Sequence, residues 1–191
     1  MTLIRRSFSI ALLLALACAR HETHPYAKTA VKKSPPKVQK PAEPGDTSVG
    51  AKMPGYHAKL LDGSAFDLTA QRGNVVFLNL WATWCGPCRF EIPELEQMHR
   101  QYAAKGLKVV GVSLDEGGVD AVKEFVTQQK MTYPIVLDPE GNLANVFQTS
   151  VIPTSVLIDR RGTIVWKNYG AVSMSDSALK RALEKALNEK G

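Results

Sequence analysis

Residues Phe77–Leu95 read FLNLWATWCGPCRFEIPEL and join an apolar run, two cysteines and an acidic segment. The apolar run is typical of a buried strand, and the segment after the cysteines has a helical pattern. Cys85 is therefore expected near a helix N-terminus with its sulfur exposed, where free N–H groups and the helix dipole stabilise a thiolate. Cys88 lies one turn later on the same face and is expected to be more buried. Gly86 and Pro87 suit the first turn, where the missing N–H of proline costs nothing.

Strand and helix patterns alternate over residues 51–191, a length that suits one domain. Strands are expected at 74–82, 107–114, 133–138, 154–159 and 163–168, and helices at 93–105, 119–130, 141–149 and 176–190. Such alternation predicts an α/β fold with a partly parallel central sheet and helices on both faces. The turn at Arg161-Gly162 predicts a hairpin, and therefore antiparallel strands at one edge of a mixed sheet.

The first residues of the chain predict export. Residues 1–17 have a basic start, an apolar run too short to span a bilayer and a small-residue end, as in a signal peptide. Two cleavage alternatives stay open. LALAC resembles the lipobox of bacterial lipoproteins, which places a lipid on Cys18, and the Ala-x-Ala that ends at Ala17 also suits ordinary signal peptidase. Lipidation would leave Cys85 and Cys88 as the only thiols able to pair, since the chain has three cysteines.

Residues 18–50 are predicted to form a disordered, lipid-anchored linker that is rich in proline and lysine. Residues 1–50 hold eight Lys/Arg and three Asp/Glu, which is a net +5 of the whole chain's +6. The basic character therefore belongs to the signal and linker, so nucleic-acid binding by the domain at 51–191 has little support.

The Cys-x-x-Cys pair has three other interpretations besides redox chemistry. A zinc site needs two further ligands, and the chain has no second cysteine pair and only scattered histidines. A purely structural disulfide would close a loop too short to stabilise the fold much. A fold that has lost its activity would not need both sulfurs. Redox chemistry is therefore favoured, and no metal or cofactor is predicted.

The chain resembles the thioredoxin fold in three features: WCGPC after a buried strand, Ile152-Pro153-Thr154 before another strand, and a final strand, hairpin and helix. More narrowly, GNVVFLNLWATWCGPCRFEIPEL with GLKVVGVSLD and VIPTSVLIDRRGTIV resembles the TlpA/ResA branch of membrane-tethered thiol-disulfide oxidoreductases in the redoxin group. The resemblance covers about residues 50–191. It implies an N-terminal β-hairpin extension, which residues 51–72 match more weakly.

The resemblance also implies residue roles. Cys85 attacks and Cys88 resolves, which makes them the redox disulfide. Pro153 matches a cis-proline opposite the cysteines, so the backbone of Ile152 would pair with an extended client segment; an ordinary proline at the start of a strand is the alternative. Trp84 is expected to form an apolar docking surface beside the pair, whereas Trp81 belongs to the core. The expected client-binding residues are Trp84, Gly86, Pro87, Ile152 and Pro153.

One position departs from thioredoxin. Thioredoxins carry a buried aspartate six residues before the first cysteine, but here that residue is Asn79, which cannot titrate. Glu91 matches an acidic position that is thought to tune the cysteines in ResA-like proteins. It would take up the proton of Cys88 and raise thiol pKa values by repulsion. The alternative is a solvated glutamate on the helix surface, as expected for Glu94 and Glu96.

The resemblance finally implies a cell-envelope enzyme that exchanges disulfides with client proteins. The CGPC sequence is that of thioredoxin, whose potential of about −270 mV makes it a reductant, in contrast to DsbA at about −120 mV. A periplasmic, lipid-anchored reductase recharged by a membrane electron donor is expected, with clients such as apocytochrome c or oxidase copper sites.

The same fold also hosts two rival functions. A peroxiredoxin-type thiol peroxidase needs Pro-x-x-x-Thr/Ser-x-x-Cys, and this chain has Leu78 and Ala82 at the first two positions. A non-catalytic copper-binding or client-binding module is the other alternative, and fold alone does not exclude it.

Overall fold

The computed structural model describes residues 45–189. The predicted signal peptide, Cys18 and most of the predicted linker lie outside these residues. Within the described part, no helix has both the length and the apolar character needed to cross a membrane. The N–H of Gly50 donates to the Ile164 carbonyl at 2.8 Å, so residues just before position 51 already contact the sheet. The domain boundary at 51 stays a prediction.

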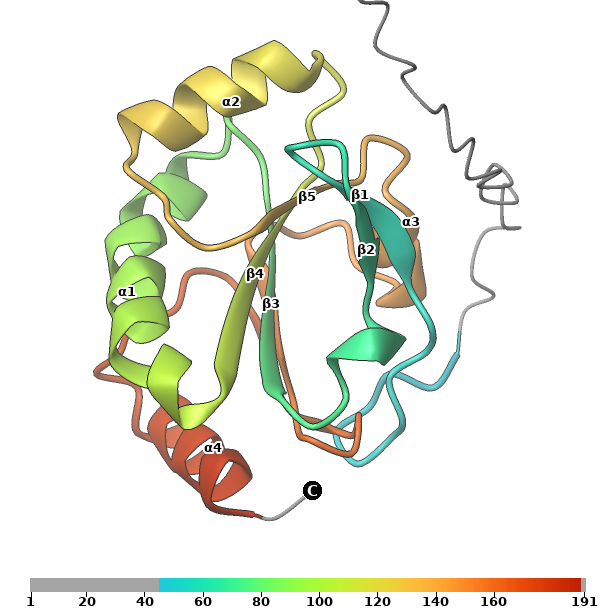
Figure 1. Ribbon diagram of the computed structural model, residues 1–191, viewed down its shortest axis with the longest axis vertical. Coiled ribbons are helices and arrows are strands. Elements are labelled where there is room, and N and C mark those ends of the chain that lie inside the picture. Colours follow the sequence, from blue (N-terminus) through green and yellow to red (C-terminus); the bar gives the residue numbers. More distant parts are fainter. Residues whose placement is uncertain (1–44, 190–191) are drawn as a thin grey trace, which may run out of the picture. The chain divides into compact units, whose positions relative to one another are not determined.

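A seven-stranded mixed sheet forms the centre of the described part, in the order β2-β1-β5-β4-β3-β6-β7 (Figure 1). The strands are β1 (His57–Leu60), β2 (Ala65–Asp67), β3 (Val75–Trp81), β4 (Leu107–Ser113), β5 (Ile135–Leu137), β6 (Thr154–Ile158) and β7 (Ile164–Tyr169). Strands β3, β4 and β5 are parallel, and the other neighbouring pairs are antiparallel. The five strands expected from the apolar runs are confirmed as β3 to β7. The β6–β7 hairpin lies at one edge, and the N-terminal hairpin β1–β2 lies at the other.

Helices cover both faces of the sheet, as expected. They are α1 (Gly86–Tyr102), α2 (Val119–Gln128), α3 (Asn142–Val146) and α4 (Ser177–Asn188), with short 3₁₀ turns at Thr69–Gln71 and Ala103–Lys105. The buried faces of α1, α2 and α4 contribute to one hydrophobic cluster, and α3 contributes to a second cluster with the N-terminal hairpin. Figure 1 shows α1 and α4 on one side of the central strands and α3 on the other.

Strand β3 is buried along its whole length and separates the two clusters. Phe77 and Trp81 belong to the first cluster, and Leu78 and Leu80 to the second, because successive side chains of a strand point to opposite faces. Asn79 is the polar exception, and a buried amide needs hydrogen-bond partners. Its partners are part of the site described below.

Gly111 in β4 leaves room for the ring of Trp81 to pack closely against the sheet. A Cβ at Gly111 would lie 2.9 Å from Trp81 Nε1 and 3.1 Å from a ring carbon of Tyr133. Only glycine therefore lets both rings approach the strand this closely. Trp81 is 1% exposed, which confirms its prediction as a core residue.

Candidate active site

The two cysteines form a disulfide at the start of α1, directly after β3. Cys85 is the N-cap residue of α1, and its sulfur accepts a hydrogen bond from the Cys88 N–H at 3.2 Å. A sulfur in this position faces the positive end of the helix dipole, which favours a thiolate when the bond is reduced. Gly86 and Pro87 occupy the exposed first turn, where the sequence placed them.

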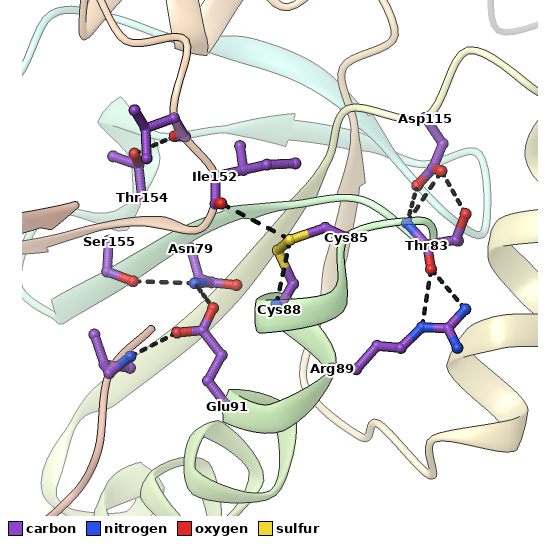
Figure 2. Close-up of a disulfide and its surroundings, with 12 residues drawn as sticks. Asn79, Thr83, Cys85, Cys88, Arg89, Glu91, Asp115, Ile152, Thr154 and Ser155 are labelled. Atoms are coloured by element: carbon purple, nitrogen blue, oxygen red, sulfur yellow. Dashed lines mark hydrogen bonds between the residues drawn. A yellow bond between two sulfur atoms is a disulfide. The ribbon is translucent and has the colours of Figure 1, made fainter. Parts of the chain in front are cut away.

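The sulfurs are more enclosed than the sequence indicated. Cys88 is 1% exposed, and Cys85 is only 5% exposed. The expectation of an exposed Cys85 sulfur is therefore wrong for the disulfide form, although the order of burial is as expected. The loop before β6, the neighbour of β3, contributes to this enclosure, because the Ile152 carbonyl oxygen lies 3.8 Å from Cys85 Sγ (Figure 2).

The loop before β6 faces the disulfide with its main chain. The Ile152–Pro153 peptide bond is cis, and Pro153 is buried directly before the strand. The carbonyl of Pro153 accepts a hydrogen bond from Gly170 N–H at 2.8 Å, which ties the loop to the end of β7. Trp84, which directly precedes Cys85, is 70% exposed. Ile152 thus contacts the pair, and Gly86 and Pro87 lie in the same helical turn, while the role of these residues in client binding stays a prediction.

Glu91 lies below the disulfide on the buried face of α1 and is 1% exposed, so it is not a solvated surface residue. Its two oxygens accept hydrogen bonds from Asn79 Nδ2 at 2.7 Å and from the Val172 N–H at 2.9 Å. The same amide nitrogen of Asn79 donates to Ser155 Oγ at 3.0 Å. Asn79, which occupies the thioredoxin aspartate position, is therefore a direct partner of the carboxylate (Figure 2).

Burial raises the pKa of Glu91 to about 7, although the hydrogen bonds from Val172 and Asn79 act in the opposite direction. A carboxyl group with this pKa is present in both protonation states at neutral pH and is suited to general acid–base work. Cys88 and Glu91 are three residues apart on one helix, so their side chains lie on the same face. The site therefore combines a dithiol, a helix N-terminus and a buried proton acceptor.

Curated proteins include relatives of this chain. Thiol-disulfide oxidoreductase ResA of Bacillus cereus is 34% identical over 122 residues, which are 64% of this chain and 70% of the relative. ResA of Geobacillus thermodenitrificans is 32% identical over 137 residues, which are 72% and 77% of the two chains. Residues 49–167 also match the AhpC/TSA family. The chain belongs to the ResA group of the AhpC/TSA family. Proteins of this group are thiol-disulfide oxidoreductases, and so is this chain.

Solved structures agree with the ResA-group assignment. A crystal structure of a candidate DsbE, a thiol:disulfide interchange protein from Chlorobium tepidum, has a TM-score of 0.68 and 33% identity. The similarity covers 74% of this chain and 99% of that one. StoA from Bacillus subtilis has a TM-score of 0.58 and 26% identity, with 76% and 99% of the chains covered. The expected thioredoxin-like fold is confirmed.

Glu94 and Glu96, two further glutamates of α1, are also less exposed than the sequence indicated. Glu94 accepts a hydrogen bond from the Met174 N–H at 2.7 Å, and Glu96 accepts one from the Thr132 N–H at 2.9 Å. Both are half-buried. The expectation that they are solvated is wrong because their carboxylates bind the backbone of neighbouring loops.

The sequence interpretation missed a second polar group beside the cysteines, formed by Thr83, Arg89 and Asp115. Asp115 follows the carboxyl end of β4, and the cysteine turn follows the carboxyl end of β3. Trp81 and Ser113 are paired in the parallel register of these strands, so the two ends meet at one edge of the sheet. An acidic residue at that edge, where α/β proteins commonly place functional groups, was the available signal.

No group of three or more His, Cys, Asp or Glu side chains within residues 45–189 is arranged to hold a metal ion. The disulfide at the start of α1 and the buried Glu91 carboxyl support the exchange of thiols and disulfides, with Glu91 available for the proton.

Glu91 also predicts a pH dependence of stability for the disulfide form. Its pKa is about 7 when folded and 4.5 in the unfolded reference, so the carboxyl stabilises the fold fully below about pH 4.5. That contribution, about 3 kcal/mol, is lost as the pH rises to about 7. We expect the free energy of unfolding of the wild type, minus that of Glu91→Gln, to fall by about this amount between pH 4.5 and 8. Urea denaturation measures it, and an equal difference at both pH values would contradict the prediction.

Proposed function

We propose that this chain reduces disulfide bonds of client proteins on the periplasmic side of the cell envelope. The observation that carries the proposal is the buried Glu91, which lies on the face of α1 that also holds Cys88 and accepts a hydrogen bond from Asn79. A purely structural disulfide has no use for a buried carboxyl with a pKa of about 7, whereas a dithiol that must lose and regain protons does.

The first step is attack by the Cys85 thiolate on one sulfur of the client disulfide. A new bond forms between Cys85 Sγ and that sulfur, the client S–S bond breaks, and the other client sulfur leaves as a thiolate. Cys85 suits this role because its sulfur faces the Cys88 N–H at the start of α1, and it is the more exposed of the two cysteines.

The second step releases the client. Cys88 gives its proton to the Glu91 carboxylate and attacks Cys85 Sγ, which forms the Cys85–Cys88 disulfide and expels the second client thiolate. Two electrons pass from the dithiol to the client in the complete exchange. Glu91 is suited to the proton transfer because burial raises its pKa to about 7, close to the working pH.

Client docking is assigned to the residues around the pair. The cis-proline loop presents the Ile152 carbonyl toward Cys85 Sγ at 3.8 Å, so an extended client segment would lie along this main chain. Trp84 is 70% exposed and offers an apolar surface beside the disulfide. Gly86 and Pro87 leave the first turn of α1 open to the client because neither has a long side chain.

The direction and the cellular setting are proposed from the sequence. The CGPC motif is that of thioredoxin, a reductant at about −270 mV. The leader at residues 1–17 supports export, and a lipid on Cys18 would anchor the domain through the linker at 18–50. We assign electron supply to a membrane donor protein. As clients we propose apocytochrome c haem sites or oxidase copper-site cysteines.

A redox titration tests the direction. The full chain is equilibrated in glutathione or dithiothreitol buffers, and free Cys85 and Cys88 are trapped and counted by mass spectrometry. We expect a midpoint well below about −200 mV, and a midpoint near about −120 mV would reverse the proposed direction. Rapid peroxide consumption without a thiol donor would favour the peroxidase alternative, and stoichiometric Cu(I) binding would favour the binding module. The mass of the N-terminal peptide from the native host distinguishes lipidated Cys18 from cleavage after Ala17.

A further inference from the structure

Thr83 lies in the turn between β3 and α1, two residues before Cys85, and side chains bind its polar groups on both sides (Figure 2). Its N–H donates to the two carboxylate oxygens of Asp115 at 3.1 and 3.0 Å, and its hydroxyl donates to Asp115 Oδ1 at 2.6 Å. Its carbonyl accepts hydrogen bonds from Arg89 Nε at 3.1 Å and Nη2 at 2.8 Å. The main chain before the nucleophile is therefore held between an anion and a cation.

Asp115 is itself fixed by the sheet. The hydroxyl of Ser113 donates to Asp115 Oδ2 at 2.8 Å, and the Asp115 N–H donates back to that hydroxyl at 3.3 Å. Ser113 is the last residue of β4, and it pairs with Trp81 at the end of β3. The carboxylate therefore occupies a position set by the rigid parallel pair, which is the element best able to hold a neighbouring turn in place.

Arg89 is fixed on the opposite side. Its guanidinium lies over the ring of Phe125 in α2, 5.2 Å from the ring centroid, in addition to its two bonds to Thr83. This contact holds a long side chain close to the helix start. The turn that carries Cys85 is thus connected to β4 through Asp115 and to α2 through Arg89.

We propose that Asp115 is a positioning residue for Cys85, which it serves by fixing Thr83 and with it the N-cap geometry that aims the Cys85 sulfur at the Cys88 N–H. The inference rests on the proposed function, in which the Cys85 thiolate is the nucleophile. Without the carboxylate, the Thr83 N–H and hydroxyl lose their acceptor, the turn relaxes, and the sulfur loses alignment with the helix start.

The direction in which the pKa of the Cys85 thiol changes distinguishes a positioning role of Asp115 from a simple charge effect. Charged side chains near the cysteine turn include Glu91 and Arg89 on α1 and Asp115 after β4, of which Arg89 and Asp115 bind Thr83 directly. Removing the negative charge of Asp115 would by electrostatics alone lower the pKa of the Cys85 thiol. Loss of positioning raises that pKa, because the thiolate loses a hydrogen bond from the Cys88 N–H.

The test measures the rate of iodoacetamide alkylation at Cys85 against pH in the reduced full chain, with mass spectrometry of the Cys85 peptide. For Asp115→Ala we expect the midpoint of the profile to move up by about one pH unit, as for loss of one charge-assisted hydrogen bond. Asp115→Asn keeps one acceptor oxygen for Thr83 and should shift the midpoint by less than half as much. A midpoint that stays or moves down in Asp115→Ala overturns the proposal, as does an equal shift in both variants.

Asp159 provides a matched control in the β6–β7 hairpin. Its carboxylate accepts hydrogen bonds from the N–H groups of Arg161 at 2.9 Å and Thr163 at 2.8 Å, so it holds a turn in the same way. Asp159→Ala should lower the melting temperature and leave the alkylation profile unchanged, and an equal shift in this control would also overturn the proposal. A wild-type midpoint at the ordinary thiol value would instead contradict the proposed function.

If Asp115→Ala does not fold, two milder substitutions at Thr83 test the same contact. Thr83→Val removes only the hydroxyl that donates to Asp115 at 2.6 Å, and Thr83→Ser keeps it. The valine variant should move the midpoint up and the serine variant should not. Identical profiles for the two variants would reject the role of this contact.

Discussion

A Cys88→Ser variant will accumulate mixed disulfides between Cys85 and client proteins, whereas a Cys85→Ser variant will form none. Exchange activity in the Cys85 variant should fall by several orders of magnitude, because a serine hydroxyl neither ionises at neutral pH nor forms a disulfide. In the Cys88 variant the attack persists, but the intramolecular release is lost. The measurement is capture of client proteins from envelope extracts, followed by non-reducing electrophoresis and mass spectrometry of the linked peptides.

The two variants are expected to behave differently because the two cysteines differ in burial. Cys85 borders the cis-proline loop and Trp84, while Cys88 lies deeper, against the core. A double variant that lacks both thiols is the control for non-covalent capture. Equal trapping by the two single variants, or trapping through Cys88 in Cys85→Ser, would contradict the assignment of nucleophile and resolving cysteine.

Replacement of Glu91 by glutamine should slow the release of a trapped client by about 10²-fold, because the proton acceptor for Cys88 is lost while the shape of the side chain is kept. The release rate of the wild type should depend on pH with a midpoint near 7, the value to which burial raises the pKa of Glu91. The variant should lose this midpoint. Single-turnover kinetics with a model disulfide peptide, followed from pH 5.5 to 9, measure both effects.

Glu94→Gln is the control for this experiment. Glu94 lies on the same helix and also binds a backbone N–H, that of Met174 at 2.7 Å, but it is half-buried rather than buried. Its replacement should change stability and leave the release rate and its pH midpoint in place. A normal release rate in Glu91→Gln, or an equal loss in Glu94→Gln, would remove Glu91 from the proposed mechanism.

The strands of the sheet could be predicted from the sequence because their signals are local. Strands β3 to β7 are short apolar runs between turn residues, and the hairpin has its Arg161-Gly162 turn. The helix start at the cysteine motif is confirmed, because α1 begins at Gly86 directly after its N-cap Cys85, and it continues without a break through Pro93 into the helical pattern expected at 93–105. A proline more often marks a helix start, so the residue pattern alone did not show that Pro93 lies inside the same helix. The N-terminal hairpin followed from family resemblance rather than from its own weak pattern.

The burial of Glu91 and Cys85 could not be predicted from the sequence, because it depends on contacts between segments that are far apart along the chain. Glu91 is enclosed by the backbone near Val172 and by Asn79, which Ser155 holds. Nothing within a few residues of Glu91 distinguishes it from Glu94. The enclosure of Cys85 by Ile152 has the same origin, because the two residues meet only when β6 pairs with β3.

The dependence of Glu91 on Val172 has a consequence for biogenesis. In a chain that is synthesised from its N-terminus, both thiols emerge well before the segment around Val172. Until that segment docks on α1, the Glu91 carboxyl is hydrated and has the acidity of a free side chain, so it is a poor acceptor for a thiol proton at neutral pH. The buried environment that raises the pKa of Glu91 is therefore complete only once the segment around Val172 has docked on α1, so a partly folded molecule could attack a disulfide but would release it slowly.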